Sequence, residues 1–396
     1  MSAGSTLRRK FAGTVALGAL ITGAAHAGTT FVPYLDARIE HDSNVFRASS
    51  EAAAFAANGD PTLGDTDEEY VAGMDGTYLW SRQKLTAKIE GRRFEYNHFK
   101  SLNHNEYRAE LGLDWTLSQF LDGKFDAHQE RLMAPFVLGN SSQLTINIDR
   151  LASADVDLNI NPSWRLVGGG YVHKLDSPLQ NFPDFVQRDS NAHVGLDYLG
   201  IAKLTYGLRF DRTDGKFENA QNVGPYTQYT GALTGAYQVT GLTTLNAALG
   251  YSTRDQTGVT GRVSGLTGTF AYSRQLTGKT RFSLSVTRAI NSYLAAGGSE
   301  VDTTAGGELH WDATYKIHVE LVYSYIRSVF VGQIIPGSSA NGRVDRSPLE
   351  QVKITYSILR PLMLDLYANH QSRRSNVALF NYTDTTYGLD ARYSFR

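Results

Sequence analysis

Residues that could support catalysis are scattered along the chain and form no recognised catalytic pattern. Gly278-Lys279-Thr280 resembles the end of a phosphate-binding loop, but Ser273 stands where the first glycine is required. No Gly-x-Ser-x-Gly elbow occurs, the ten histidines show no metal-ligand spacing, and the absence of cysteine excludes thiolate chemistry and disulfides. We predict no catalytic residue, no metal site and no cofactor; a hydrolase assembled from separate strands stays open as an alternative.

Charged residues form the more informative candidate site, because they alternate with apolar residues over long stretches. Between residues 105 and 118, Arg108, Glu110 and Asp114 have one parity, and Leu111 and Leu113 have the other. This period is typical of a strand with one polar and one apolar face. In a closed barrel the polar face would line a hydrated lumen. The candidate lumen-lining residues are Lys88, Glu90, Arg92, Arg108, Glu110, Asp114, Asp126, His128, Glu130, Asp155, Asp157, Lys203, Arg209, Asp211, Arg281, Glu320, Lys353, Asp365, Asp390 and Arg392.

Positive and negative residues are mixed in this set. A strongly ion-selective pore uses a ring of one sign, so we expect a wall that suits a neutral, hydrogen-bonding solute. Aromatic residues such as Tyr34, Tyr198 and Tyr356 could stack on a sugar. They are also explained as girdles at the two lipid headgroup levels.

Eighteen alternating segments must position these residues, and their connections are short and long in turn. The short links centre near residues 82, 121, 162, 200, 241, 278, 316 and 361. The long links cover approximately 41–68, 98–104, 133–143, 174–186, 213–225, 254–258, 292–298, 329–346 and 373–380. A repeat of about 40 residues therefore contains two strands, whereas a propeller blade of similar length contains four.

This pattern predicts an all-β fold, namely a closed antiparallel transmembrane β-barrel of about 18 strands. A soluble sandwich would also alternate, but it needs an apolar core shared by two sheets and protected edges. An even strand number, short periplasmic turns, longer extracellular loops and aromatic girdles are typical of outer-membrane barrels. At eighteen strands we expect a lumen too wide to be filled by strand side chains.

The first 27 residues read as a secretory signal peptide. Arg8, Arg9 and Lys10 precede an apolar stretch, and Ala25-His26-Ala27 supplies an A-x-A cleavage site. We therefore expect export through the inner membrane, removal of residues 1–27 and one barrel domain over residues 28–396. A formal charge of −1 provides no basic field for nucleic acid, which we exclude as a partner.

One segment after the first expected strand resembles a known family. His41-Asp42-Ser43-Asn44-Val45-Phe46-Arg47 is similar to a motif of the β-barrel porin 2 family. Within that family, Ser81-Arg82-Gln83-Lys84-Leu85, the run 93–99, Leu102, 105–107 and 113–115 resemble EpsL-type proteins, which are encoded with exopolysaccharide machinery. The resemblance covers residues 31–125 and is architectural beyond them. One departure is that Phe395 is followed by Arg396, whereas such barrels usually end on an aromatic residue.

The resemblance implies an outer-membrane porin associated with exopolysaccharide biosynthesis, either a passive conduit or an anchor for the polymer. Its expected partners are outer-membrane lipid, extracellular polysaccharide and periplasmic export machinery. The alternatives are a general diffusion porin for small solutes and a structural barrel within an export complex.

Overall fold

The computed structural model describes residues 28–136, 143–178, 185–219, 224–258, 262–293, 298–331 and 342–395. Its architecture is a single antiparallel sheet of eighteen strands in which each strand pairs with its neighbours in the chain. The first strand also pairs with the last one, so the sheet closes into a barrel. The predicted all-β barrel of eighteen strands is confirmed.

The strands are 13 to 16 residues long, which exceeds the 9–11 residues needed to cross a bilayer at a tilt of about 45°. Their bounds are β1 Thr29–Asp42, β2 Asp65–Trp80, β3 Gln83–Tyr96, β4 His104–Thr116, β5 Leu121–Met133, β6 Ile146–Asn161, β7 Trp164–Asp176, β8 Val186–Ile201, β9 Leu204–Glu218, β10 Tyr226–Thr240, β11 Thr243–Gln256, β12 Val263–Thr277, β13 Thr280–Tyr293, β14 Gly298–Asp312, β15 Ile317–Val331, β16 Val344–Leu359, β17 Leu362–Ser375 and β18 Tyr382–Ser394.

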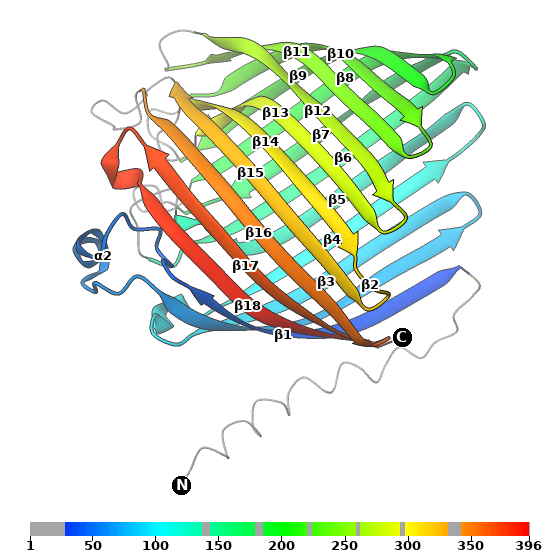
Figure 1. Ribbon diagram of the computed structural model, residues 1–396. Coiled ribbons are helices and arrows are strands. Elements are labelled where there is room, and N and C mark those ends of the chain that lie inside the picture. Colours follow the sequence, from blue (N-terminus) through cyan, green and yellow to red (C-terminus); the bar gives the residue numbers. More distant parts are fainter. Residues whose placement is uncertain are drawn as a thin grey trace.

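The two ends of the barrel differ in the length of their connections. One end carries tight turns such as 81–82, 162–163, 241–242 and 278–279, and the other carries the longer links, including 43–64 with helix α2 (Glu51–Asn58). Figure 1 shows α2 at one end of the tilted strands and the C-terminus at the opposite end. The alternation of short turns and long links therefore agrees with the sequence analysis.

Several strands extend further toward the long links than the sequence suggested. The link expected over 41–68 is 43–64, the one expected over 174–186 is 177–185, and the one expected over 213–225 is 219–225. Polar residues at these strand ends read as loop residues in the sequence. In the folded chain their backbones continue the ladder, for example at Asp67, which pairs with Tyr96.

The outer face of the barrel is apolar over its middle. Exposed side chains of one parity include Ile89 on β3, Leu111 on β4, Leu208 on β9 and Leu366 on β17. Charged residues of the opposite parity face the interior, which is the arrangement that a barrel surrounded by lipid requires. Among the described residues, no helix is long and apolar enough to span a membrane.

Candidate functional site

The inner wall of the barrel is the candidate site, because it collects the charged residues that the sequence singled out. Except for Lys203, all of those residues lie on strands and have the inward parity. Several of them meet in pairs. Lys88 Nζ lies 3.2 Å from Glu90, Arg108 Nη2 lies 2.9 Å from Glu130, and Lys353 Nζ lies 3.0 Å from Glu320.

Lys203 requires a correction. The sequence placed it on the wall, but it lies in the two-residue turn between β8 and β9, exposed and with a φ of 67°. Leu204, Tyr206 and Leu208 follow it and face outward at every second position. Extending this alternation back by one residue assigned Lys203 to the inner face. A left-handed backbone at this position closes the hairpin instead of continuing the strand.

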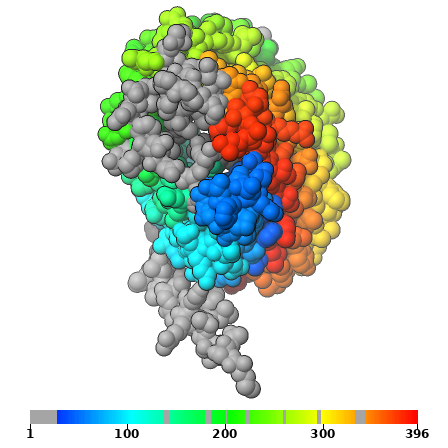
Figure 2. Space-filling view, turned by 90° about the vertical axis from the view of Figure 1, so that its left-hand side faces the viewer, coloured from blue at the N-terminus to red at the C-terminus, as the bar shows by residue number. Residues whose placement is uncertain are grey.

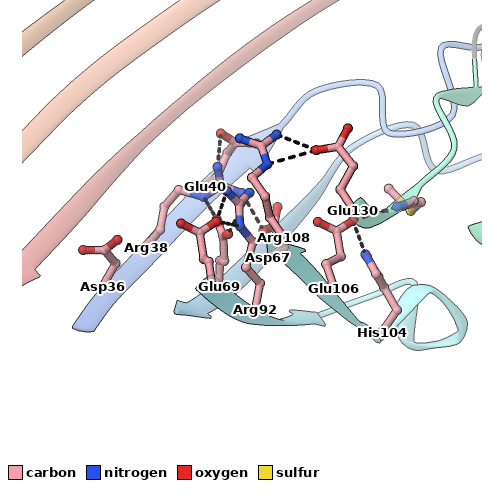
Figure 3. Close-up of polar contacts among 12 residues, drawn as sticks. Asp36, Arg38, Glu40, Asp67, Glu69, Arg92, His104, Glu106, Arg108 and Glu130 are labelled. Atoms are coloured by element: carbon pink, nitrogen blue, oxygen red, sulfur yellow. Dashed lines mark hydrogen bonds and ion pairs between the residues drawn. The ribbon is translucent and has the colours of Figure 1, made fainter. Parts of the chain in front are cut away.

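A dense ionic network covers the inner face of β1 to β3 (Figure 3). Arg38 Nε lies 3.0 Å from a carboxylate oxygen of Glu69, and a second nitrogen of Arg38 lies 3.7 Å from Asp67. Arg92 bridges Glu69 at 3.6 Å and Glu90. Each arginine therefore contacts more than one carboxylate, and these contacts hold the Arg38 and Arg92 side chains against the wall.

Carboxylates outnumber cations along this part of the wall. The inward-facing acids of β1–β4, β17 and β18 include Asp36, Glu40, Asp67, Glu69, Asp75, Glu90, Glu106, Glu110, Asp365 and Asp390, whereas the cations are Arg38, Lys84, Lys88, Arg92, Arg108, Arg373 and Arg392. Asp365 and Asp390 stand directly opposite each other in the register. The inner wall is therefore acidic here, which the balanced charge of the whole chain conceals.

The sequence analysis missed Asp36, Arg38, Glu40, Asp67 and Glu69. Asp67 fell inside a stretch that was expected to be a loop. Asp36, Arg38 and Glu40 alternate with the apolar Ile39 along β1, and Glu69 precedes Tyr70 on β2. Because Ile39 and Tyr70 face outward, their neighbours could have been assigned to the inner face from the sequence.

Three tyrosines lie flat against the inner wall, each over a glycine of the neighbouring strand. Tyr34 pairs with Gly73, Tyr226 with Gly215 and Tyr367 with Gly388. A Cβ atom on any of these glycines would lie 2.1–2.4 Å from the nearest atom of the tyrosine side chain that covers it.

Each of these hydroxyls donates to a carboxylate. The acceptors are Glu90 at 2.6 Å from Tyr34, Asp189 at 2.7 Å from Tyr226 and Glu40 at 2.5 Å from Tyr367. Tyr34, which could have belonged to a headgroup girdle, is thus an inner-wall residue with 1% of its surface exposed. Because the rings lie along the wall, they occupy little of the lumen.

The motif at residues 41–47 anchors the first long link to the barrel rim. The Asp42 carboxylate accepts hydrogen bonds from the Asn44 amide at 2.7 Å and from Arg47 Nη1 at 2.8 Å. Asn44 Nδ2 donates to the carbonyl of Thr383 on β18 at 3.1 Å, and Ser43 Oγ donates to Asp384 at 3.1 Å. Figure 2, which views the long-link end, shows the blue segment around α2 beside the red C-terminal strands.

The apolar residues of the same motif join three links of the rim. Val45 packs with Phe99 and Leu102 from the link between β3 and β4, and Phe46 contacts Phe136, which follows β5. Further along the first link, the Thr62 amide donates to Asp60, and together with the nearby His98 ring this lowers the pKa of the Asp60 carboxyl to about 2. The motif thus holds a polar link across part of one barrel end.

Comparison with known proteins found similar solved structures but no matching family. No protein-family model matches the sequence, and no curated protein matches it; the resemblance to the β-barrel porin 2 family and to EpsL-type proteins is therefore not confirmed. Among solved structures, the chain is similar to OpdK of Pseudomonas aeruginosa, crystallised with vanillate, at a TM-score of 0.48 and 14% identity over 92% of this chain and 99% of that chain.

Two further proteins of Pseudomonas aeruginosa are similar to a comparable degree. OccK3 (OpdO) gives a TM-score of 0.47 and 15% identity over 92% of this chain and 95% of that chain. The siderophore receptor PirA gives 0.44 and 8% identity over 92% of this chain and 80% of that chain. No substrate is transferred from these proteins to the present chain.

The chemistry of the wall is that of a hydrated, charged surface. Within the described residues, no group of three or more histidine, aspartate or glutamate side chains is placed to hold a metal ion. The histidines of the wall are paired with carboxylates, as His193 is with Asp155 at 3.1 Å and His173 with Asp149 at 3.1 Å. Such a wall can attract ions and can form hydrogen bonds with water and small polar solutes.

Proposed function

We propose that the chain is an outer-membrane porin that passively conducts small hydrophilic solutes and prefers cations. The observation that carries the proposal is the division of the barrel into an apolar outer face and a charged inner face on which carboxylates predominate. An acidic wall raises the local concentration of cations and lowers that of anions. The preference is expected to be moderate, because arginines neutralise part of the acidic network.

The topology supports this placement in the membrane. Outer-membrane barrels carry short turns on the periplasmic side and longer loops outside, so the link with α2 would face the exterior. The signal peptide expected at residues 1–27 lies outside the described residues, and its removal remains part of the proposal.

Conductance in a planar lipid bilayer tests the proposal directly. Purified protein should insert as discrete steps, and a KCl gradient should give a reversal potential with the sign of a cation-preferring channel. Two matched double variants show whether the ion preference arises from the inner wall. Asp75→Asn and Glu110→Gln together remove inner-wall charge, whereas Asp255→Asn and Glu218→Gln remove outer-face charge. Only the first pair should lower the preference.

The absence of conductance steps from folded protein would instead favour a structural barrel within a complex. The exopolysaccharide role implied by the sequence resemblance stays a prediction. A deletion strain that loses surface polymer but takes up small solutes normally would favour that role over the porin proposed here.

A further inference from the structure

The outer face carries a row of arginines near the long-link end of the barrel. Arg327 on β15 pairs in register with Arg346 on β16, and Arg346 pairs with Arg374 on β17. Arg288 on β13 extends the row, because it stands opposite Thr303 on β14, which in turn stands opposite Arg327. All four have the parity of the exposed apolar residues, such as Val286, Tyr323, Ile354 and Leu366.

This row lacks the carboxylates that accompany several other outward cations. Like charges placed directly opposite each other destabilise a sheet. Arg188, in contrast, lies 2.9 Å from Glu218, and Arg212 lies 2.8 Å from Asp214. Within the described residues, no ion pair involves Arg327, Arg346 or Arg374. Glu350 has the same outward parity on β16 but lies four residues further along, so its Cα atom is about 13 Å from that of Arg346.

The height of the row matches a lipid headgroup level. Tyr356, which is exposed at the short-turn end of β16, lies ten residues from Arg346. Ten residues of a strand tilted by about 40° rise about 26 Å, close to the apolar band of about 25 Å in such barrels. On the outer face between them, Val352 and Ile354 lie nearer Tyr356, and Pro348 and Glu350 lie nearer Arg346. The arginines therefore lie just beyond the apolar band on the long-link side, at the level expected for lipid headgroups.

An apolar hollow lies next to the row on the outer face of β13–β15. Its volume is about 480 Å³, and its lining includes Leu284, Ala305, Gly307, Tyr323 and Tyr325. Ala305 and Gly307 leave space beside the larger side chains. Tyr325 is two residues from Arg327 on the same face, so the hollow begins directly below Arg327. A cationic row above an apolar hollow fits a molecule with anionic groups joined to acyl chains.

We propose that Arg327, Arg346 and Arg374, with Arg288 at one end, bind the phosphate groups of lipid A in the outer leaflet, with an acyl chain in the hollow. Guanidinium groups bind phosphate oxygens through paired hydrogen bonds. Neighbouring strands lie about 4.8 Å apart, so the three paired arginines extend over about 10 Å and offer more than one phosphate site. Phosphate between the guanidiniums would remove the repulsion within the row. The inference rests on the outer-membrane placement in the proposed function, but not on conduction.

Native mass spectrometry of the full mature protein in detergent tests this site, with bisphosphorylated hexa-acyl lipid A as the probe. The variant Arg327→Gln, Arg346→Gln, Arg374→Gln should bind at least tenfold more weakly than the wild type. The control Arg150→Gln, Lys174→Gln, Arg188→Gln removes three cations from one register row of β6–β8. Those cations are already paired with Asp176 and Glu218, so its affinity should change less than twofold. Heat-modifiable gel migration verifies that both variants fold.

Several results of the lipid A titrations would overturn the site. These are unchanged affinity in the arginine-row variant, equal losses in both variants, or equally tight binding of dephosphorylated lipid A. Phosphatidylglycerol that competes as well as lipid A would show general attraction of anionic lipid and would also contradict the proposal. Conductance separates this inference from the porin function: the arginine-row variant should conduct as the wild type does. A barrel that binds lipid A through the row without conducting would refute only the porin.

Discussion

Arg47 Nη2 lies 3.2 Å from a carboxylate oxygen of Asp384, and this contact ties the first long link to the last strand of the barrel. The Asp384 side chain is only 1% exposed, and it also accepts a hydrogen bond from Ser43. The pair sits at the seam where β1 meets β18, so the motif at residues 41–47 joins the two ends of the sheet as well as fixing a loop.

Replacing Arg47 by glutamine should release the first link while the barrel stays folded. A hydrogen bond to a charged group contributes about 1.5–3 kcal/mol, which corresponds to roughly a ten- to hundredfold change in the opening of a local segment. Proteinase K should therefore cleave within residues 48–64 much faster in Arg47→Gln than in the wild type. Glu51→Gln is the control, since Glu51 is exposed in the first turn of α2. Equal cleavage rates in both variants would show that the Arg47 contact does not hold the link.

The tyrosine–glycine pairs are expected to keep the lumen wide, because each glycine lets a tyrosine ring lie along the wall. In Gly73→Val the new side chain would occupy the place of the Tyr34 ring, whose nearest atom lies 2.3 Å from a Cβ built on Gly73. The ring should turn away from Glu90 into the lumen, and single-channel conductance should fall. Gly265→Val is the matched control, because Gly265 has the inward parity on β12 and nothing lies within 4 Å of its added Cβ. A drop of the same size in the control would point to a general loss of barrel packing.

The two faces of the strands predict opposite consequences of the same substitution. Leu208→Arg places a charge on the outer face at mid-strand and should cost about 2–4 kcal/mol of folding free energy in the bilayer. Glu110→Arg changes an inward side chain that is 45% exposed, so ion preference should change and folding should not. Urea titrations in lipid vesicles measure the first effect, and reversal potentials measure the second. Similar destabilisation by both would contradict the assignment of the faces.

The strand number could be predicted from the sequence because period-two alternation and turn spacing are local properties. Leu111 and Glu110 reveal their faces without any knowledge of the partner strand. The acidic wall depends on which strands become neighbours. Arg38 forms an ion pair with Glu69 because β1 pairs with β2, and Asp365 lies opposite Asp390 because β17 pairs with β18. The role of the motif at 41–47 was inaccessible for the same reason, since its partner Asp384 lies at the far end of the chain.

Cysteine labelling predicts which end of the barrel faces the cell exterior. The chain contains no cysteine, so each introduced thiol is the only one present. Ala56 is an exposed residue of α2 in the first long link, whereas Gly241 lies in a tight turn with open space around its Cβ position. Gly59 is unsuitable, because its φ of 79° as the C-cap of α2 would strain a cysteine. Gly337, another position in a long link, lies outside the described residues.

On intact cells, a membrane-impermeant maleimide should modify Ala56→Cys and spare Gly241→Cys. After the outer membrane is permeabilised, both variants should react, which shows that the protected thiol is reactive and the variant is folded. The reason is the asymmetry of the links, since long connections belong outside and tight turns in the periplasm. Labelling of Gly241→Cys alone on intact cells would reverse the orientation, and it would also move the arginine row of β15–β17 from the outer to the inner leaflet, where lipid A is absent.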